Sequence, residues 1–315
     1  MNSPDLPIPL DRFVELDSGL RLHYLDVGEG PVVVWLHGSG PGASGYSNFK
    51  GNYPAFAAAG FRNIVLDLPG FGRSDKPADV QYNLDFFVAC LNGLLQKIGV
   101  TKCTLLGNSL GGAIARGQAL AHPDTVERLI LMAPGGVEER ETYFRMEGIV
   151  RMVETFAKGP MGPVEMRHVM SLQVFDPSML DDTIINERSA IAPSQPANLF
   201  STMMVPNMTT RLHEIKAPIF GFWGTDDKFN PHTGALKVVE NAPNARMTLL
   251  NQCGHWVQTE HRTRYGFVVE GRPLVVEQVI VEGIGHMAAV AEEERPIVPR
   301  ALALLLHRRV ECHFV

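Results

Sequence analysis

Short apolar runs recur along the chain, and each ends in a turn rich in Gly, Pro or Asn. Runs without polar alternation are typical of strands that are buried on both faces of a parallel sheet. They cover residues 32–36, 63–68, 103–107, 128–132, 218–223 and 247–250. Helical periodicity lies between them, notably over residues 84–98 and 110–121. This alternation predicts an α/β fold with a doubly wound, mostly parallel sheet.

The alternation of strand and helix stops between about residues 137 and 208. This stretch is rich in methionine and has helical patterns over residues 146–156 and 164–172. Such a segment is either ordinary helical core or an adaptable apolar cap over a substrate. Its position between two strands of the sheet favours the cap. We therefore expect a core formed by 1–137 and 209–265, a helical cap at 138–208 and an atypical tail at 266–315.

The composition is that of a soluble globular protein with a small-molecule partner. Of the 315 residues 45% are hydrophobic, and the net charge of −6 offers no basic surface to nucleic acid or an anionic membrane. The apolar stretches are too short to span a bilayer, and the N-terminus lacks a signal-peptide pattern. The four cysteines lie far apart, which suits a reducing compartment. We expect a cytoplasmic protein without nucleic-acid or membrane partners, and a homo-oligomer is left open.

A candidate nucleophile lies between a predicted strand and a predicted helix, in Gly107-Asn108-Ser109-Leu110-Gly111. A Gly-x-Ser-x-Gly motif alone is weak evidence, but the strand–turn–helix context is that of a nucleophile elbow. Small residues are needed there because the strained turn crowds its neighbours. The turn also places Ser109 at a helix N-terminus, where amides and the helix dipole favour developing negative charge.

A serine nucleophile needs a base, and the base needs an orienting carboxylate, here in the chain order Ser, Asp, His. The predicted strand at 218–223 leads into a loop that contains Asp226 and Asp227. We assign Asp227 as the acid because its place before a Lys-Phe-Asn-Pro turn resembles the acid loop of hydrolases that have such a nucleophile elbow. Asp226 is interpreted as a turn or capping residue. The strand at 247–250 leads into Cys253-Gly254-His255-Trp256, and His255 is the expected base.

A second histidine competes for the role of base. His286 ends another strand-like run in a Gly-Ile-Gly-His sequence. His255 follows the acid strand after one helix-and-strand unit, which is the expected topology, whereas His286 needs an additional unit. The sequence favours His255.

The loop after the strand at 32–36 has the small residues of an oxyanion site, in His37-Gly38-Ser39-Gly40-Pro41-Gly42-Ala43. We expect the backbone N–H groups of Ser39 and Leu110 to bind a tetrahedral oxyanion. His37 is interpreted as a hydrogen-bonding residue that organises the loop.

The same loop also matches Gly-x-Gly-x-x-Gly at residues 40–45, and Asp67 follows at the end of the next apolar run. This is the best case for a nucleotide-binding oxidoreductase. The match is a lone fingerprint and leaves the serine, acid and base unexplained. We therefore rank this interpretation below that of a serine hydrolase, which uses all three. The eleven histidines show no metal-ligand spacing, and we expect no metal and no cofactor.

These residues resemble the meta-cleavage product hydrolases, which are carbon–carbon bond hydrolases of the α/β-hydrolase superfamily. The resemblance runs from about Leu20 to His261. The segments that carry it are Gly38–Ala43, Tyr46–Asn48, Gly107–Ser109, Met132–Gly136, Met146–Ile149, Arg188 and Cys253–Trp256. It implies a fold with a cap and a dienoate substrate from aromatic ring fission, which is cleaved to a hydroxydienoate and a carboxylic acid.

The resemblance also implies substrate-binding roles for residues outside the triad. Arg188 would bind the substrate carboxylate, since a planar guanidinium matches a carboxylate bidentately. Asn48 and Asn108 would orient the dienol and keto oxygens, and Gly40 and Trp256 would line the site. Without the resemblance, Arg188 reads as a solvated surface residue of the cap.

Two other functions remain as alternatives. A carboxylesterase could use the same triad, although Arg188 has no evident role with a neutral ester. A non-catalytic binding protein of the same fold would not need the triad. Two features depart from the expected pattern: the tail beyond His261, and Arg116, a charge on an otherwise apolar helix.

Overall fold

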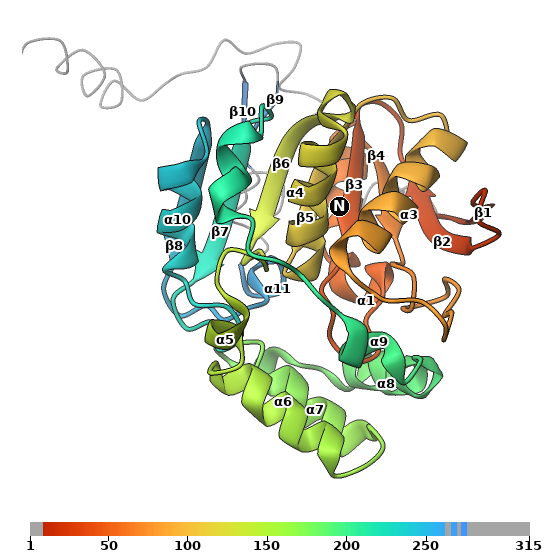
Figure 1. Cartoon of the computed structure of the whole chain (residues 1–315), viewed down its shortest axis with the longest axis vertical. Helices are drawn as coiled ribbons and strands as arrows, with labels where there is room; N and C mark the ends of the chain where they lie inside the picture. Colours follow the sequence, from red (N-terminus) through yellow and green to blue (C-terminus); the bar gives the residue numbers. More distant parts are fainter. Residues whose placement is uncertain (1–8, 262–265, 270–271, 276–315) are drawn as a thin grey trace, which may run out of the picture.

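The computed structural model describes residues 9–261, 266–269 and 272–275. Eight strands form one sheet in the order β1-β2-β4-β3-β5-β6-β7-β8 (Figure 1). They are β1 Leu10–Glu15, β2 Arg21–Val27, β3 Val32–Leu36, β4 Arg62–Leu66, β5 Cys103–Asn108, β6 Val126–Met132, β7 Ile219–Gly224 and β8 Ala245–Leu250. From β4 to β8 all neighbours are parallel, whereas β2 is antiparallel to both β1 and β4. The predicted doubly wound, mostly parallel sheet is confirmed.

Helices connect the strands and fill the segment between β6 and β7. The α-helices are α1 Gly45–Phe49, α2 Tyr53–Ala58, α3 Leu84–Lys97, α4 Leu110–Ala121, α5 Arg140–Tyr143, α6 Glu147–Ala157, α7 Pro163–Ser171, α8 Asp182–Ile191, α9 Asn198–Thr202, α10 Gly234–Asn241 and α11 Val257–Glu260. Short 3-10 helices are η1 Pro123–Thr125, η2 Pro177–Met179, η3 Ala192–Ser194 and η4 Thr209–Glu214. In the described residues, none of these helices is long and apolar enough to cross a membrane.

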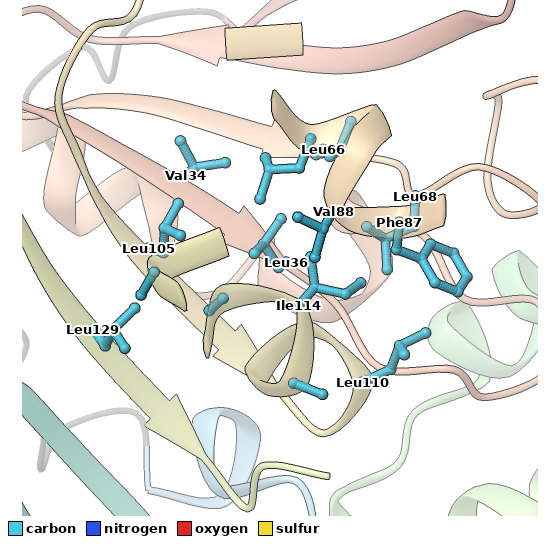
Figure 2. Packing of buried hydrophobic residues seen from close by; sticks show 14 of the residues in the cluster. Val34, Leu36, Leu66, Leu68, Phe87, Val88, Leu105, Leu110, Ile114 and Leu129 are labelled. Atoms are coloured by element: carbon cyan, nitrogen blue, oxygen red, sulfur yellow. The ribbon is translucent and has the colours of Figure 1, made fainter. Parts of the chain in front are cut away.

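Alternate residues of the central strands serve two hydrophobic layers. In β3, Val34 and Leu36 belong to the larger layer, whereas Val33 and Trp35 belong to the other. Figure 2 shows the larger layer, in which strand residues meet side chains of α3 and α4 such as Ile114. Because successive side chains of a strand point to opposite faces, both faces must be apolar when helices cover both. This explains the uninterrupted apolar runs in the sequence.

The observed strands differ from the expected ones in two respects. The run at 247–250 is not buried on both faces, because β8 is the edge strand of the sheet and Leu249 is 45% exposed. The antiparallel strands β1 and β2 were not predicted, since their mixture of charged and apolar residues lacks the uninterrupted apolar character of the central strands.

The segment between β6 and β7 is helical, and α6 to α9 lie beyond the carboxyl ends of the parallel strands (Figure 1). Its methionines are partly internal, as Met166 and Met170 pack in one cluster with Trp256. The boundaries 138 and 208 stay a prediction. In the tail, β9 Gly266–Val269 pairs antiparallel with β10 Arg272–Val275. His286 lies outside the described residues.

Candidate active site

Ser109 occupies a strained turn between β5 and α4. Its φ of 54° and ψ of −115° lie in a region that non-glycine residues rarely adopt. The turn fits only because its neighbours are glycines: a Cβ on Gly111 would lie 1.9 Å from the Leu36 carbonyl oxygen. A Cβ on Gly107 would lie 2.4 Å from the backbone of Gly111. The Ser109 N–H donates to the Met132 carbonyl at 3.0 Å, which fixes the turn to β6.

Asp227 and His255 form a buried pair. Asp227 Oδ2 accepts from His255 Nδ1 at 2.8 Å and from Trp223 Nε1 at 3.1 Å. Asp227 Oδ1 accepts from the N–H groups of Phe229 at 2.8 Å and Asn230 at 2.9 Å. Because a carboxylate oxygen accepts, the contact of Asp227 with His255 is satisfied by the tautomer of His255 that carries its proton on Nδ1 and leaves Nε2 as an acceptor. His255 and Ser109 line the same pocket.

Asp226, the neighbouring carboxylate, has a different position. Its side chain is exposed and accepts from its neighbour Thr225 Oγ1 at 3.0 Å, and its N–H donates to the Cys253 carbonyl at 2.9 Å. The structure therefore brings Asp227, and not Asp226, to the histidine.

The loop after β3 approaches the nucleophile from the other side. A Cβ on Gly38 would lie 3.3 Å from Ser109 Cβ, and Ser39 lines the pocket. Leu110 begins α4, and the first amides of a helix have no partner within it. His37 holds this loop in place: its Nδ1 bonds to the Gly38 carbonyl at 2.7 Å, and its Nε2 accepts from the Leu68 N–H at 3.1 Å. Burial lowers the pKa of His37 to about 4, so the ring is neutral, as a loop-organising residue requires.

Arg188 is a buried cation in the wall of the pocket. It is 1% exposed, and its guanidinium lies 4.6 Å from the ring centroid of Trp256. Nη1 donates to the Pro41 carbonyl at 3.3 Å, and Nε has no hydrogen-bond partner within the part of the chain that the structure describes. The adjacent Glu187 pairs with Lys50 at 2.7 Å instead. Among the described residues no carboxylate forms an ion pair with Arg188, and this distinguishes it from the solvated surface residue of the alternative interpretation.

Two asparagines also line the pocket. Asn108 Nδ2 donates to the carbonyls of Met132 at 3.1 Å and His255 at 3.3 Å, while its Oδ1 is buried and, among the described residues, has no hydrogen-bond partner. Asn48 Nδ2 donates to the Ser44 carbonyl at 2.8 Å. Both amides are thus fixed by backbone contacts, and Asn108 presents an acceptor oxygen.

The pocket has a polar end and an apolar end. At the polar end, a Cβ on Gly40 would lie 3.0 Å from Arg188 Nη1 and 3.2 Å from Gln173 Nε2. At the other end, the Phe229 ring lies 5.2 Å from the His255 ring and packs against the start of α6 at Gly148. Helix α6 contributes further lining residues at this apolar end. The loop from Gly38 to Gly40 lines the pocket between the two ends, since Gly38 lies beside Ser109 and Gly40 beside Arg188. A ligand can therefore lie with its anionic end at Arg188 and its apolar end at α6.

The structure adds five lining residues that the sequence analysis did not assign. They are Ile149, Met152, Gln173, Phe229 and Asn230. Phe229 and Asn230 lie in the acid loop, two and three residues after Asp227, so their position was within reach of sequence reasoning. Ile149, Met152 and Gln173 come from the cap, where the pattern of residues predicts helices but not which of their side chains face the pocket.

The nucleotide-binding alternative is wrong for this loop. Asp67 accepts from the N–H groups of Gly45 at 2.7 Å and Arg73 at 2.8 Å and from His23 Nδ1 at 2.7 Å, so it is a structural residue. A Cβ on Gly42 would lie 2.0 Å from the Arg188 carbonyl oxygen. Gly40 and Gly42 pack closely against Arg188, and a Cβ on Gly45 would lie 2.7 Å from the Leu66 carbonyl oxygen of β4. The helix that follows has only five residues.

Arg116 is a second buried arginine, on the helix that starts at Ser109. Its guanidinium donates to the carbonyls of Gly136 at 3.3 Å and of Gly135, and the Gly135 N–H donates to the Ser109 carbonyl at 2.9 Å. The charge that looked misplaced in an apolar helix therefore supports the loop behind the nucleophile.

The chain is similar in sequence to the alpha/beta hydrolase fold family and, within it, to hydrolases of 2-hydroxy-6-oxo-dienoates. The model of the alpha/beta hydrolase fold family matches residues 31–262. A 2-hydroxy-6-oxononadienedioate/2-hydroxy-6-oxononatrienedioate hydrolase of Comamonas testosteroni is 37% identical over 254 residues, which cover 78% of this chain and 88% of that protein. A 2-hydroxy-6-oxo-6-phenylhexa-2,4-dienoate hydrolase of Burkholderia cepacia is similar to the same extent, 37% over 254 residues with 78% and 88% coverage.

Solved structures resemble the chain over most of its length. A meta-cleavage product hydrolase from Pseudomonas fluorescens IP01, complexed with acetates, has a TM-score of 0.70 and 26% identity, and the match covers 80% of this chain and 93% of that one. The 2-hydroxy-6-oxo-6-phenylhexa-2,4-dienoate hydrolase from Rhodococcus sp. strain RHA1 has a TM-score of 0.69 and 25% identity, with 81% and 95% coverage.

Proposed function

The chain belongs to the α/β-hydrolase fold family, in the group of the meta-cleavage product hydrolases, and from this we propose how its site cleaves a carbon–carbon bond. The substrate is a 2-hydroxy-6-oxohexa-2,4-dienoate-type ring-fission product, and the products are 2-hydroxypenta-2,4-dienoate and a carboxylic acid. The enzyme is a serine hydrolase without a cofactor, and its triad is Ser109, Asp227 and His255.

The observation that carries this proposal is the buried Arg188, which has no carboxylate partner among the described residues. A buried charge is costly unless it is paired and hydrogen-bonded. Arg188 lies in the same pocket as Ser109 and His255, so an anionic ligand would reach both the cation and the nucleophile. The dienoate carboxylate supplies that anion, and a neutral ester does not.

Binding at Arg188 places the rest of the substrate along the pocket. The 2-hydroxyl and keto oxygens would lie near Asn48 and Asn108, which offer fixed amide groups. The distal ketone would lie over Ser109, with its substituent toward Phe229 and α6. Ketonisation moves the proton of the 2-hydroxyl to C5 and leaves a 2,6-diketone, in which C5 is a better leaving carbon.

The chemical steps then follow from the triad. His255 Nε2 takes the Ser109 proton as the hydroxyl oxygen bonds to C6, and the amides of Ser39 and Leu110 bind the resulting oxyanion. The C5–C6 bond breaks, its electron pair leaves with C5 as a dienolate, and the proton on His255 passes to that fragment. Water, activated by His255, hydrolyses the acyl-enzyme and releases the carboxylic acid and free Ser109.

The test is to add yellow ring-fission dienoates and to follow the loss of their visible absorbance. The wild-type protein should bleach them, and Ser109→Ala should not. Rapid hydrolysis of simple esters without bleaching of any dienoate would instead support the carboxylesterase.

A second arm tests the role of Arg188. Arg188→Met should lower kcat/KM for the dienoate roughly 100-fold or more, the loss expected when one partner of a buried charge pair is removed. Turnover of a neutral p-nitrophenyl ester should change little. Equal losses on both substrates would contradict the assignment of Arg188 to the carboxylate.

We also propose a cytoplasmic location. Cys90, Cys103 and Cys253 are buried free thiols, which suits a reducing compartment. Fractionation of the source cells tests this, with activity expected in the cytosolic fraction.

A further inference from the structure

The side chain of Glu260 lies between the cap and the loop that carries His255. It is at the end of α11, six residues after Gly254. Oε1 accepts from the Gly254 N–H at 2.7 Å, and Oε2 accepts from the Phe175 N–H at 2.6 Å. One carboxylate thus holds the backbone on the N-terminal side of the histidine and a backbone group of the segment that follows α7.

The two segments that Glu260 joins both contribute to the pocket. The Trp256 N–H donates to the Gln173 carbonyl at 3.0 Å. The residues on both sides of His255 are therefore tied to the cap, Trp256 directly and Gly254 through the side chain of Glu260. The backbones are in direct contact, because a Cβ on Gly254 would lie 2.7 Å from the Gln173 carbonyl oxygen. Gln173 and Trp256 line the pocket next to Arg188.

The surroundings of Glu260 act on its carboxyl group in opposite directions. Burial is the largest influence on its pKa and raises it above the usual value, and nearby Asp226 raises it further, while the amides of Phe175, Gly254 and Asp176 lower it. Ionisation of a carboxyl whose folded-state pKa is raised lowers stability as the pH rises through that pKa. The carboxylate nevertheless keeps its two backbone contacts, with Gly254 and Phe175, and also accepts weakly from Cys253 Sγ at 3.9 Å.

We propose that Glu260 is a positioning residue for the proposed hydrolase reaction, which sets the orientation of His255 relative to Ser109 by tying the Gly254–Trp256 loop to the cap segment 173–175. Asp227 fixes the histidine ring at Nδ1, and Glu260 fixes the backbone from which that ring extends. The proposal rests on the proposed function for its dienoate substrate, but its action on His255 applies to any acyl transfer at Ser109.

The experiment compares Glu260→Gln and Glu260→Leu with the wild-type protein on two substrates, a dienoate and a p-nitrophenyl ester. Gln keeps the size of the side chain and one acceptor oxygen, so it retains one of the two hydrogen bonds, whereas Leu retains neither. Glu240→Gln is the matched control, since it removes one carboxylate from an exposed position on α10.

We expect kcat to fall about tenfold in Glu260→Gln for both substrates, and further in Glu260→Leu, because small displacements of a catalytic group strongly reduce the rate. The thermal unfolding midpoint of Glu260→Gln should stay within about 2 °C of the wild-type value. Glu240→Gln should match the wild type in both measurements.

Three outcomes overturn the proposal. The first is an unchanged kcat on both substrates, and the second is a lower unfolding midpoint with unchanged kcat, which is the result of a purely structural role. The third is a higher KM for the dienoate with unchanged ester turnover, which would place the effect in the cap alone. If the wild type hydrolyses only the ester and Glu260→Gln slows that reaction, the positioning role stands while the proposed dienoate substrate fails.

Discussion

At the scale of single residues, the acid of the triad offers the sharpest comparison, because two aspartates stand side by side. Asp227→Asn should lower kcat about 10⁴-fold, since an amide cannot hold the histidine tautomer that leaves Nε2 free as a base. Asp226→Asn removes an exposed carboxylate and should leave kcat within about twofold of the wild-type value. Steady-state kinetics on the dienoate tests both, and a large loss in Asp226→Asn would reverse the assignment.

His37 gives a pH-dependent prediction. Burial lowers the folded-state pKa of His37 to about 4, below the ordinary value of 6.5, so the unfolded chain binds a proton first as the pH falls. The stability that neutral His37 contributes is present above pH 6.5 and is lost as the pH falls toward 4. His37→Gln should therefore destabilise the protein at pH 7, and this penalty should shrink by about 2 kcal/mol at pH 4.5. Denaturant unfolding at both pH values measures the difference, and a penalty that does not change with pH would contradict a buried neutral ring.

How much of the site could be predicted differs from residue to residue. Asp227 and His255 follow from chain order and strand ends, and the structure brings them within 2.8 Å. Arg188 was assigned only through a family resemblance, since nothing in its local sequence distinguishes a buried cation from a solvated one. Glu260 could not be found, because its role depends on contact with Phe175, which is 85 residues away in the chain.

At the scale of elements, helix α6 determines the apolar end of the pocket. Met152 lines the pocket, whereas its neighbour Val153 is 49% exposed. Met152→Lys should lower kcat/KM roughly 10- to 100-fold for a dienoate with a phenyl ketone, because the bound phenyl group would bury the charge of the new lysine. The loss should be smaller for a dioate substrate, whose distal carboxylate can pair with the new lysine. Val153→Lys is the control and should change neither value, and equal losses on the two substrates would place the ketone substituent elsewhere.

The elements themselves were predictable to different degrees for a physical reason. The central strands are apolar on both faces because helices cover both, and this produces an unmistakable pattern. The strand β8 has a similar apolar run but lies at the edge, and whether a run is central or peripheral depends on its neighbours in the sheet. Strands β1 and β2 have no such run, since β1 is the opposite edge and mostly exposed, and β2 mixes Arg21, His23 and Asp26 with apolar residues.

At the scale of the whole molecule, the cap and the core must keep their relative position for Arg188 and Ser109 to act on one substrate. One polar tie between them is the ion pair of Lys50, which follows α1, with Glu187 on α8. Both side chains are about a quarter exposed, at 28% and 27%, so the pair contributes roughly 0.5–1 kcal/mol rather than the larger value of a buried pair. Each partner is close in sequence to a pocket residue, Lys50 to Asn48 and Glu187 to Arg188.

Breaking this tie should therefore weaken binding of the anionic substrate without disabling the triad. Lys50→Met is expected to raise KM for the dienoate about two- to fivefold, the equivalent of 0.5–1 kcal/mol, while kcat on a neutral ester stays unchanged. High salt should raise KM of the wild type more than that of Lys50→Met, because screening weakens a partly exposed pair. Arg211→Met, which breaks the Arg211–Glu214 pair within η4 of the core, is the matched control and should leave KM unchanged. A drop in ester turnover in Lys50→Met would mean that the ion pair supports the triad itself, and the cap would then be coupled to the chemistry as well as to binding.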